Sequence, residues 1–274
     1  MSGQRSIDHP VLAVRNLDEA AAAWEGLGFT LTPRASHPDH MGTANRLVQF
    51  ANRVFLELLE VDRPATVAPH GPEEVPPRFS FGAHNRDVLQ DGPGLSMLAL
   101  TTADAHADLE ALAARGVRTF APFAFERQTT LPDGSQALVG FSLGFATLPG
   151  FPGSIFFLCQ HKAPQHFWKE RFQTHANGAV ALEAVYLRSA QPAEDAAALA
   201  VLTGGVVRAV EDGVEVGCGG QALVVATPAQ LARLAPNAEQ GPPGLAGIAI
   251  AARNPPVAPA TVLDGIFIAW RQAA

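Results

Sequence analysis

The chain has 274 residues, of which 47% are hydrophobic and 16% are charged, and its formal net charge is −7 at pH 7. These values are typical of a folded globular protein with one large or two smaller domains, and they exclude a disordered chain and argue against a nucleic-acid partner. Two cysteines, Cys159 and Cys218, are too few for a disulfide scaffold and fit a reducing compartment. No apolar stretch approaches membrane-spanning length and no signal-peptide core is present, so we expect a cytoplasmic protein without membrane contact.

The first unit of the chain is predicted to run strand, helix, strand, strand. His9 opens the short apolar stretch 11–14, which is typical of a buried strand. Asn16, with Glu19 three residues later, predicts a capped helix over residues 17–25. Two alternating segments then predict strands over residues 45–50 and 54–59.

Three further units are related to the first, and the last of them lacks the helix. The second unit is expected to contain a strand over 94–100, a helix before Gly116, and strands over 119–127, 138–146 and 154–161, with a turn at 131–135. The third is expected to contain strands over 182–187, 206–210, 214–218 and 222–226 and a helix over 194–202. The fourth has predicted strands over 244–250 and 265–270 and no helix. Four related units, the last truncated, predict an α+β fold of paired βαβββ modules.

A strand with a leading histidine, a helix, and a closing strand that carries Leu56-Glu57-Leu58-Leu59 resemble the vicinal oxygen chelate superfamily, which includes glyoxalases, methylmalonyl-CoA epimerases, extradiol dioxygenases and bleomycin-resistance proteins. Five segments are similar to the bacterial glyoxalase-like domain proteins: residues 37–38, 42–45, 79–82, 159–161 and 175–178. The resemblance implies a glyoxalase-like domain with a functional cup in residues 1–165. Residues 166–274 would then form a degenerate, structural domain of the same type. This fold hosts several chemistries, so it does not fix the reaction.

In that superfamily, the first and the last strand of each unit can offer a ligand to a divalent metal ion. The resemblance places His9 and Glu57 at these two positions of the first unit. Glu57 lies among apolar residues, where an unpaired carboxylate would be unfavourable, so a metal, another cation or a shared proton is implied. The alternative is that His9 is a hydrogen-bonded strand histidine and Glu57 an acid of the pocket.

The second unit offers a weaker ligand set. Met97 stands at the first-strand position and is expected to point into the cup, but its thioether does not suit Mg²⁺, Mn²⁺ or Zn²⁺. Strand alternation predicts that Gln160 faces inward and that His161 faces outward. The expected metal ligands are therefore His9, Glu57 and Gln160, with His37, His40 or His161 as replacements. Cys159 follows Phe157 and Leu158, and these apolar neighbours predict a buried, inert thiol.

The expected substrate contacts lie in three segments that would surround the cup. They are Asn45 after the polar loop 37–44, Phe79, Phe81 and Asn85, and Trp168 in the aromatic segment 159–178. Each segment has an alternative role: the loop as a solvated turn, the phenylalanines as core, and the last segment as an interdomain linker. The third and fourth units carry Glu183 and Gly247 at the ligand positions and are expected to be structural.

These features favour a metal-dependent lyase or isomerase that acts on a small organic substrate with vicinal oxygens. Glu57 and a nearby histidine, His37 or His161, would be the catalytic residues, and the histidine would shuttle a proton. Glutathione is a doubtful co-substrate, because no basic cluster marks a site for its carboxylates. The alternative is a metal-free small-molecule binding protein of the bleomycin-resistance type, whose acidic cup would hold a cationic or aromatic ligand. The sequence leaves open whether the protein forms a homodimer.

Overall fold

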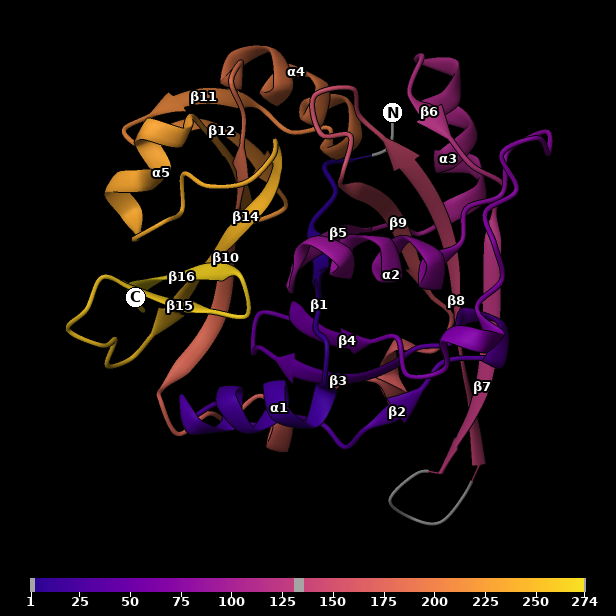
Figure 1. Cartoon of the computed structure of the whole chain (residues 1–274), viewed down its shortest axis with the longest axis horizontal. Coiled ribbons are helices and arrows are strands. Elements are labelled where there is room, and N and C mark those ends of the chain that lie inside the picture. Colours follow the sequence, from indigo (N-terminus) through magenta and orange to yellow (C-terminus); the bar gives the residue numbers. More distant parts are fainter. Residues whose placement is uncertain (1–2, 131–135, 274) are drawn as a thin grey trace.

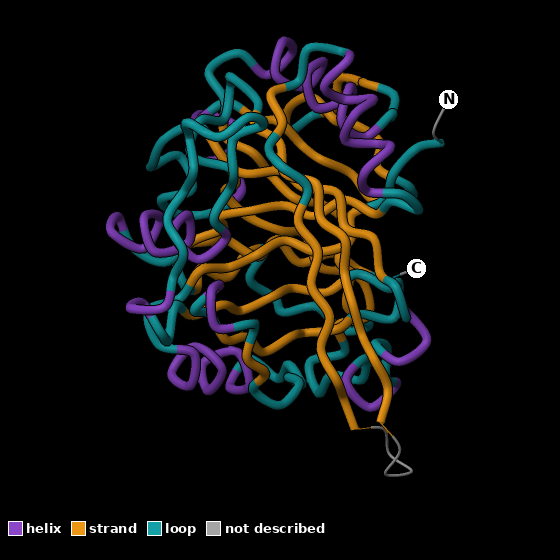
Figure 2. The backbone as a smooth tube through the Cα atoms, turned by 90° about the vertical axis from the view of Figure 1, so that its right-hand side faces the viewer, coloured by secondary structure: helices purple, strands orange, loops and turns teal. Residues whose placement is uncertain are grey.

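The computed structural model describes residues 3–130 and 136–273 and shows two sheets, each accompanied by helices (Figure 1). The tube in Figure 2 shows the strands running through the centre of the molecule, with helices and loops around them. The predicted turn at 131–135 lies outside the described residues. Within the described part of the chain, no helix is both long and apolar enough to span a membrane.

The first sheet has nine strands in the order β2-β3-β4-β1-β5-β9-β8-β6, with β7 paired to β8. Its strands are β1 (Ile7–Ala13), β2 (Ala35–Ser36), β3 (Ala44–Gln49), β4 (Phe55–Glu60), β5 (Gly94–Thr101), β6 (Arg118–Thr119), β7 (Phe123–Thr130), β8 (Gln136–Thr147) and β9 (Ile155–His161). β1 is antiparallel to β5, β1 is parallel to β4, and β5 is parallel to β9. The first two units therefore meet at their first strands, as paired modules do.

The second sheet repeats this scheme with seven strands in the order β11-β12-β13-β10-β14-β16-β15. Its strands are β10 (Ala179–Arg188), β11 (Val207–Val210), β12 (Gly213–Cys218), β13 (Gln221–Ala226), β14 (Gly244–Ala252), β15 (Ala260–Leu263) and β16 (Ile266–Gln272). β10 is antiparallel to β14, and each is parallel to the last strand of its own unit. The α+β fold of paired modules is confirmed, and the fourth unit has no helix between β14 and β15.

The helices are α1 (Leu17–Gly26), α2 (Phe81–Asp91), α3 (Ala105–Ala114), α4 (Pro192–Thr203) and α5 (Pro228–Leu234). Asn16 caps α1, because its side-chain oxygen accepts from the backbone N–H groups of Asp18 and Glu19. No helix was predicted over α2, and its residues Phe81 and Asn85 were expected to contact substrate beside the cup. Ser80 caps this helix by accepting from the backbone N–H of Ala83.

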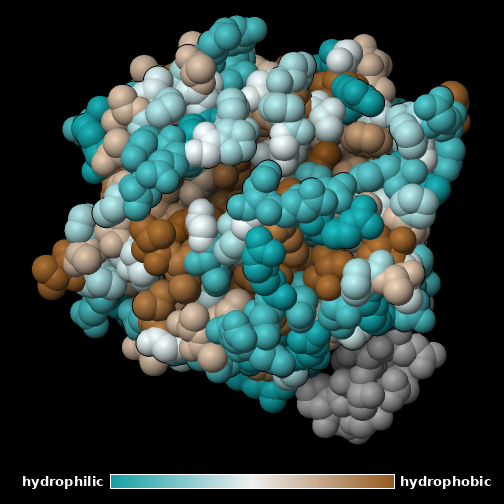
Figure 3. Space-filling view, in the orientation of Figure 1, coloured by the Kyte–Doolittle hydropathy of each residue, from teal (hydrophilic) through white to brown (hydrophobic). Residues whose placement is uncertain are grey.

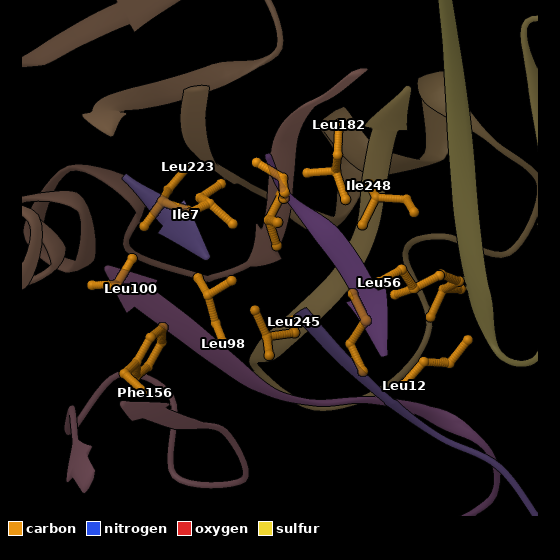
Figure 4. Packing of buried hydrophobic residues seen from close by; sticks show 14 of the residues in the cluster. Ile7, Leu12, Leu56, Leu98, Leu100, Phe156, Leu182, Leu223, Leu245 and Ile248 are labelled. Atoms are coloured by element: carbon orange, nitrogen blue, oxygen red, sulfur yellow. The ribbon is translucent and has the colours of Figure 1, made fainter. Parts of the chain in front are cut away.

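One hydrophobic core joins the two sheets. Ile7, Leu98 and Leu100 of the first sheet belong to the same buried cluster as Leu182, Leu245 and Ile248 of the second (Figure 4). In Figure 3 the visible face is largely hydrophilic, and hydrophobic residues gather near its middle. A core shared between lobes predicts that neither sheet is stable with that face uncovered.

The inner face of the second sheet is filled by side chains. Leu231 of α5, Tyr186 of β10 and Phe267 of β16 pack in one buried cluster there. Glu183, at the position that corresponds to His9, pairs with Arg271 at 3.4 Å (Oε2 to Nη1). This packing contrasts with that of the first sheet, where a cavity remains.

Candidate functional site

A cavity of ≈ 50 Å³ lies on the inner face of the first sheet. Its lining is aromatic and apolar, with four polar groups on one side. The lining residues are His9, His37, Met41, Asn45, Leu47, Phe55, Glu57, Phe81, Phe125, Phe141, Leu143, Phe157, Cys159 and Phe167. Both units of the first sheet contribute to this lining, so the paired modules build the cavity together.

An irregularity in β1 brings an unexpected carboxylate to the polar side of the cavity. Ile7 pairs with Leu100 and His9 pairs with Ala99, so Asp8 is an extra residue without a partner in β5. Such a bulge lets neighbouring side chains lie on one face of a strand. Sequence reasoning missed Asp8, because strict alternation would have turned it away from His9.

His9 bridges the two buried carboxylates. Its Nδ1 lies 2.6 Å from Oδ1 of Asp8, and its Nε2 lies 3.5 Å from Oε2 of Glu57. The imidazole ring stacks on Phe55 with ring centroids 4.1 Å apart, and Phe157 meets its edge at 5.4 Å. These contacts fix the orientation of the ring, so Nε2 is the nitrogen presented to Glu57.

The second oxygen of Glu57 is held by polar groups from β3 and the preceding loop. Nδ2 of Asn45 donates to Oε1 of Glu57 at 2.6 Å, and Nε2 of His37 lies 3.7 Å from the same oxygen. Nδ1 of His37 is 2.9 Å from the hydroxyl of Thr43. Arg63 donates to the backbone carbonyls of His37 and Thr43 at 3.0 and 2.9 Å, so it braces the loop that carries His37.

The charges of this network are those of an ion-paired cluster. Burial alone would lower the pKa of His9, but hydrogen bonds with Asp8 and Glu57 outweigh burial and raise this pKa to about 9. Burial alone would raise the pKa of Asp8 and of Glu57, but their partners hold both values below the usual range of a carboxyl group. At neutral pH, two carboxylates therefore face one imidazolium, which leaves one net negative charge in Asp8, His9 and Glu57.

The structure brings four of the predicted side chains together around the cavity: His9, His37, Asn45 and Glu57. Phe81 also lines it, with its ring centroid 5.7 Å from that of His37. The predicted inward orientation of Gln160 is wrong. Its Oε1 accepts from the backbone N–H of Ala105 at 3.3 Å and its Nε2 donates to the carbonyl of Ala103 at 2.6 Å, at the start of α3. Gln160 therefore cannot reach a metal ion at Glu57.

His161 takes the orientation that was predicted for Gln160. Its Nε2 lies 3.0 Å from Oδ2 of Asp8. Phe157 and Cys159 line the cavity from the same strand, which shows that the odd-numbered residues of β9 face inward. The predicted burial of Cys159 is confirmed, and this burial raises the pKa of its thiol.

Three other predicted contacts lie outside the cavity lining. Phe79 lines a second, neighbouring cavity together with Phe81. Asn85 is fully buried in α2, where its Nδ2 donates to the carbonyl of Phe81 at 2.8 Å. Trp168 packs behind Phe55 and Phe167, with ring centroids at 5.9 and 5.1 Å.

Met97 does not line the cavity, contrary to expectation. Its side chain is 0% exposed and belongs to the apolar cluster beside the cavity, where Nδ2 of Asn85 lies 3.5 Å from its sulfur. In the sheet, Met97 pairs with Val11, and Ala99 is the partner of His9. His40, one of the alternative ligands, is exposed and meets Phe123 with ring centroids 5.7 Å apart.

Comparisons with known proteins agree with this architecture. The family model described as the glyoxalase-like domain matches residues 7–203. No curated protein matches the chain significantly.

Two solved structures match nearly the whole chain. A hypothetical protein from Staphylococcus aureus has 14% identity and a TM-score of 0.73, over 98% of this chain and 100% of that one. The Mn(II)-bound glyoxalase from Novosphingobium aromaticivorans has 12% identity and a TM-score of 0.55, over 98% of this chain and 82% of that one. At these identities the two matches show the fold alone.

Proposed function

The chain belongs to the glyoxalase-like domain family, and from this premise we propose that its cavity binds a small organic molecule and catalyses a proton-transfer reaction of the lyase or isomerase type. The observation that carries the proposal is the convergence of Nε2 of His9 and Oε2 of Glu57, 3.5 Å apart, on the cavity. A carboxylate and an imidazole beside an apolar cavity are the groups that general acid–base catalysis needs.

The donor atoms present suit a divalent cation, although not with the expected third ligand. His9 and Glu57 offer an imidazole nitrogen and a carboxylate oxygen, and His37 replaces Gln160 as the third candidate. Two imidazoles and one carboxylate are ligands for Mn²⁺, Fe²⁺ or Zn²⁺. A cation bound there would polarise the carbonyl group of a substrate and stabilise negative charge on its oxygen.

The hydrogen bonds around these donors also suit that role. Asp8 holds Nδ1 of His9, so Nε2 is the ring nitrogen that would bond a cation after losing its proton, and Asn45 fixes one oxygen of Glu57. A carboxylate behind a histidine is the common outer support of metal ligands. The net negative charge of the cluster favours a cation as well.

Glu57 is the group that we propose as proton acceptor. Its partners lower its pKa, so it is ionised at neutral pH, and the amide of Asn45 orients it. His37 lies 3.7 Å from Glu57 and lines the same cavity, which places it to receive or return the proton. The phenylalanines of the lining would exclude water from a bound substrate.

The lining also limits the class of substrate. Among the described lining residues there is neither lysine nor arginine, while a carboxylate is present. We therefore expect an uncharged or cationic molecule with an apolar or aromatic part, and we expect anionic molecules to bind poorly. A small cavity of ≈ 50 Å³ admits only a small reacting part without rearrangement.

A specific observation favours the second candidate, a metal-free binding protein. The second unit offers apolar side chains where ligands would be expected: Met97 is packed in the apolar cluster and Phe157 presents its ring to His9. Aromatic rings beside a negative cluster would hold a cationic or aromatic ligand without catalysis. Turnover separates the two candidates, because only the enzyme consumes its ligand.

We also propose that residues 166–274 are structural, apart from Phe167, which lines the cavity. Support comes from the shared hydrophobic core and from the side chains of Tyr186, Leu231 and Phe267, which fill the inner face of the second sheet.

Proton exchange with solvent tests the proposed enzyme. A panel of small 1,2-dicarbonyl and 2-hydroxycarbonyl compounds would be incubated with the protein in D₂O, and deuterium incorporation would be followed by NMR. We expect Glu57→Gln to lower exchange at least about 100-fold. Glu60→Gln, at the end of the same strand and paired with Arg34, should exchange at the wild-type rate. Equal exchange by wild type and Glu57→Gln would refute the role of Glu57, and binding without any exchange would favour the binding protein.

A further inference from the structure

Asp8, Cys159 and His161 form a cluster beside the His9–Glu57 pair. One potential ligand atom from each of the three lies within 4.8 Å of the other two. Among the described residues, no other three His, Cys, Asp or Glu side chains lie this close together. The set His9, Glu57 and His37, in particular, is more widely spaced. A carboxylate, a thiol and an imidazole together are typical ligands of zinc.

The nitrogen and oxygen donors of the cluster are already separated by nearly the distance that two ligands of one ion have. Nε2 of His161 and Oδ2 of Asp8 are 3.0 Å apart. Two ligands that each lie about 2.0–2.1 Å from a tetrahedral Zn²⁺ are roughly 3.3 Å from each other. A bound ion would therefore require only a small displacement of these side chains.

Strand geometry supplies the third donor. Cys159 and His161 are two residues apart on β9, so their side chains share the inner face of the sheet. On the neighbouring strand β5, Thr101 pairs with Cys159, and β1 lies beyond it. Only the bulge in β1 turns Asp8 toward them, because His9 occupies the inward position of the regular strand.

Asp8 can serve this cluster and His9 at once. Oδ1 of Asp8 holds Nδ1 of His9 at 2.6 Å, while Oδ2 is the oxygen nearest His161. The hydrogen bond to His9 fixes the carboxylate plane, as the outer partners of metal ligands commonly do. His161 is 10% exposed at its side chain, so the cluster has a route to solvent, and Phe141 and Phe167 hold its ring at centroid distances of 4.8 and 5.0 Å.

We propose that Asp8, Cys159 and His161 form a binding site for a divalent cation of the thiophilic type, such as Zn²⁺, separate from the His9–Glu57 pair. On binding, the sulfur of Cys159 gives up its proton to solvent and bonds the cation, and no electron is transferred. Thiolate and carboxylate together balance the two positive charges, while His161 bonds as the neutral imidazole. A fourth ligand would come from water.

Cobalt(II) is the probe that tests the site in the full-length, metal-free protein. A cobalt ion bound to a thiolate absorbs in the near ultraviolet by charge transfer, whereas a cobalt ion bound only by nitrogen and oxygen lacks this band. We expect the band to appear on titration and to be removed by Zn²⁺. Cys159→Ser should abolish the band, and His161→Gln should weaken cobalt binding at least about tenfold.

Two further variants make the assignment specific. Cys218→Ser is the matched control, since Cys218 is equally buried but lies in the second sheet, and it should keep the band. Glu57→Gln should keep it too, whether or not the proposed reaction at Glu57 is correct. Loss of the band in Glu57→Gln but not in Cys159→Ser would overturn the proposal.

X-ray absorption at the zinc edge gives a measurement that needs no variant. Wild-type protein loaded with one equivalent of Zn²⁺ should show one sulfur neighbour at about 2.3 Å among nitrogen and oxygen neighbours. A spectrum without sulfur, or the absence of Zn²⁺ binding, would refute the site even if Cys159→Ser did not fold.

Discussion

Asp8 and His9 are consecutive residues of one strand, yet their side chains meet, with Oδ1 of Asp8 2.6 Å from Nδ1 of His9. The bulge between Ile7 and His9 makes this contact geometrically available. Because Asp8 holds one ring nitrogen, the other is directed at Glu57. The orientation and the charge of His9 both depend on this pair.

Replacement of Asp8 by asparagine should lower the pKa of His9. The wild-type value is about 9, and burial alone would lower it, so loss of one of the two carboxylates should move the pKa toward or below the ordinary 6.5. Titration of the imidazole resonances by NMR measures the change. Asp62→Asn is a control, because Asp62 pairs with Arg34 and Arg63 on the surface. An unchanged pKa of His9 in Asp8→Asn would contradict this explanation.

Stability should fall on both sides of neutral pH. The pKa of His9 rises from 6.5 to about 9 on folding, so its contribution is complete below about pH 6.5 and is lost as the pH rises through 9. The lowered pKa values of Asp8 and Glu57 act in the opposite direction: their contribution is present above about pH 4 and is lost on further acidification.

Urea unfolding at a series of pH values measures this dependence. Each unit of pKa difference corresponds to about 1.4 kcal/mol, so the alkaline loss in wild type should amount to a few kcal/mol at most. In His9→Gln the loss between about pH 6.5 and pH 9 should be much smaller. A variant that loses stability over this range as steeply as wild type would show that another group titrates.

A hard divalent cation should stabilise the protein through His9 and Glu57. Mn²⁺ prefers oxygen and imidazole ligands, so its addition to metal-free protein should raise the melting temperature. At a concentration 100 times the dissociation constant, the stabilisation would be about 2.7 kcal/mol. His9→Ala and Glu57→Gln should lose the response, and Glu60→Gln should retain it. Identical melting curves of wild type with and without Mn²⁺ would contradict cation binding at this pair.

Much of the fold could be predicted from the sequence, because its signals are local and repeated. The alternation in residues 54–59 and the Asn16 cap lie where expected, and the repeated order of elements identified the paired modules. Glu57 could be singled out as a candidate site residue because a carboxylate in a buried strand needs a partner, and it lines the cavity. The helix α2 was missed, since Phe79 and Phe81 were interpreted as substrate contacts or core residues and not as the start of a helix.

The orientation of particular strand residues could not be predicted with the same success. Strand alternation defines two faces but does not say which one is inward. An error of one residue in the assignment therefore exchanged the predicted orientations of Gln160 and His161. The bulge at Asp8 leaves no local sequence signal, because it depends on the pairing of β1 with β5. At these positions the pairing register between strands determines which face a side chain lies on, and this register cannot be inferred from one segment alone.

Removal of the C-terminal lobe should expose the shared core. A chain that ends at Ala176 would uncover Ile7, Leu98 and Leu100, which pack with residues of the second sheet. We expect this fragment to aggregate, as measured by light scattering during refolding. Glu183→Gln in the full chain is the control and should leave ligand binding in the first cavity intact, because Glu183 pairs with Arg271. A soluble, active fragment would show that residues 177–274 are dispensable.

Met97→His tests whether the second unit can be given a metal ligand. Met97 stands at the first-strand ligand position of that unit, but it is 0% exposed and is packed among apolar side chains. A histidine there would bury a polar ring in a space that is already filled, beside the amide of Asn85.

We therefore expect Met97→His to destabilise the protein by about 1–3 kcal/mol without strengthening Mn²⁺ binding. Met97→Leu conserves volume and should cost less than about 1.5 kcal/mol, so it separates the effect of polarity from that of shape. Urea unfolding gives the stability of both variants, and calorimetry with Mn²⁺ gives their affinity. If Met97→His binds Mn²⁺ more tightly than wild type at unchanged stability, the side chain at position 97 reaches the cavity and is not packed in the apolar cluster.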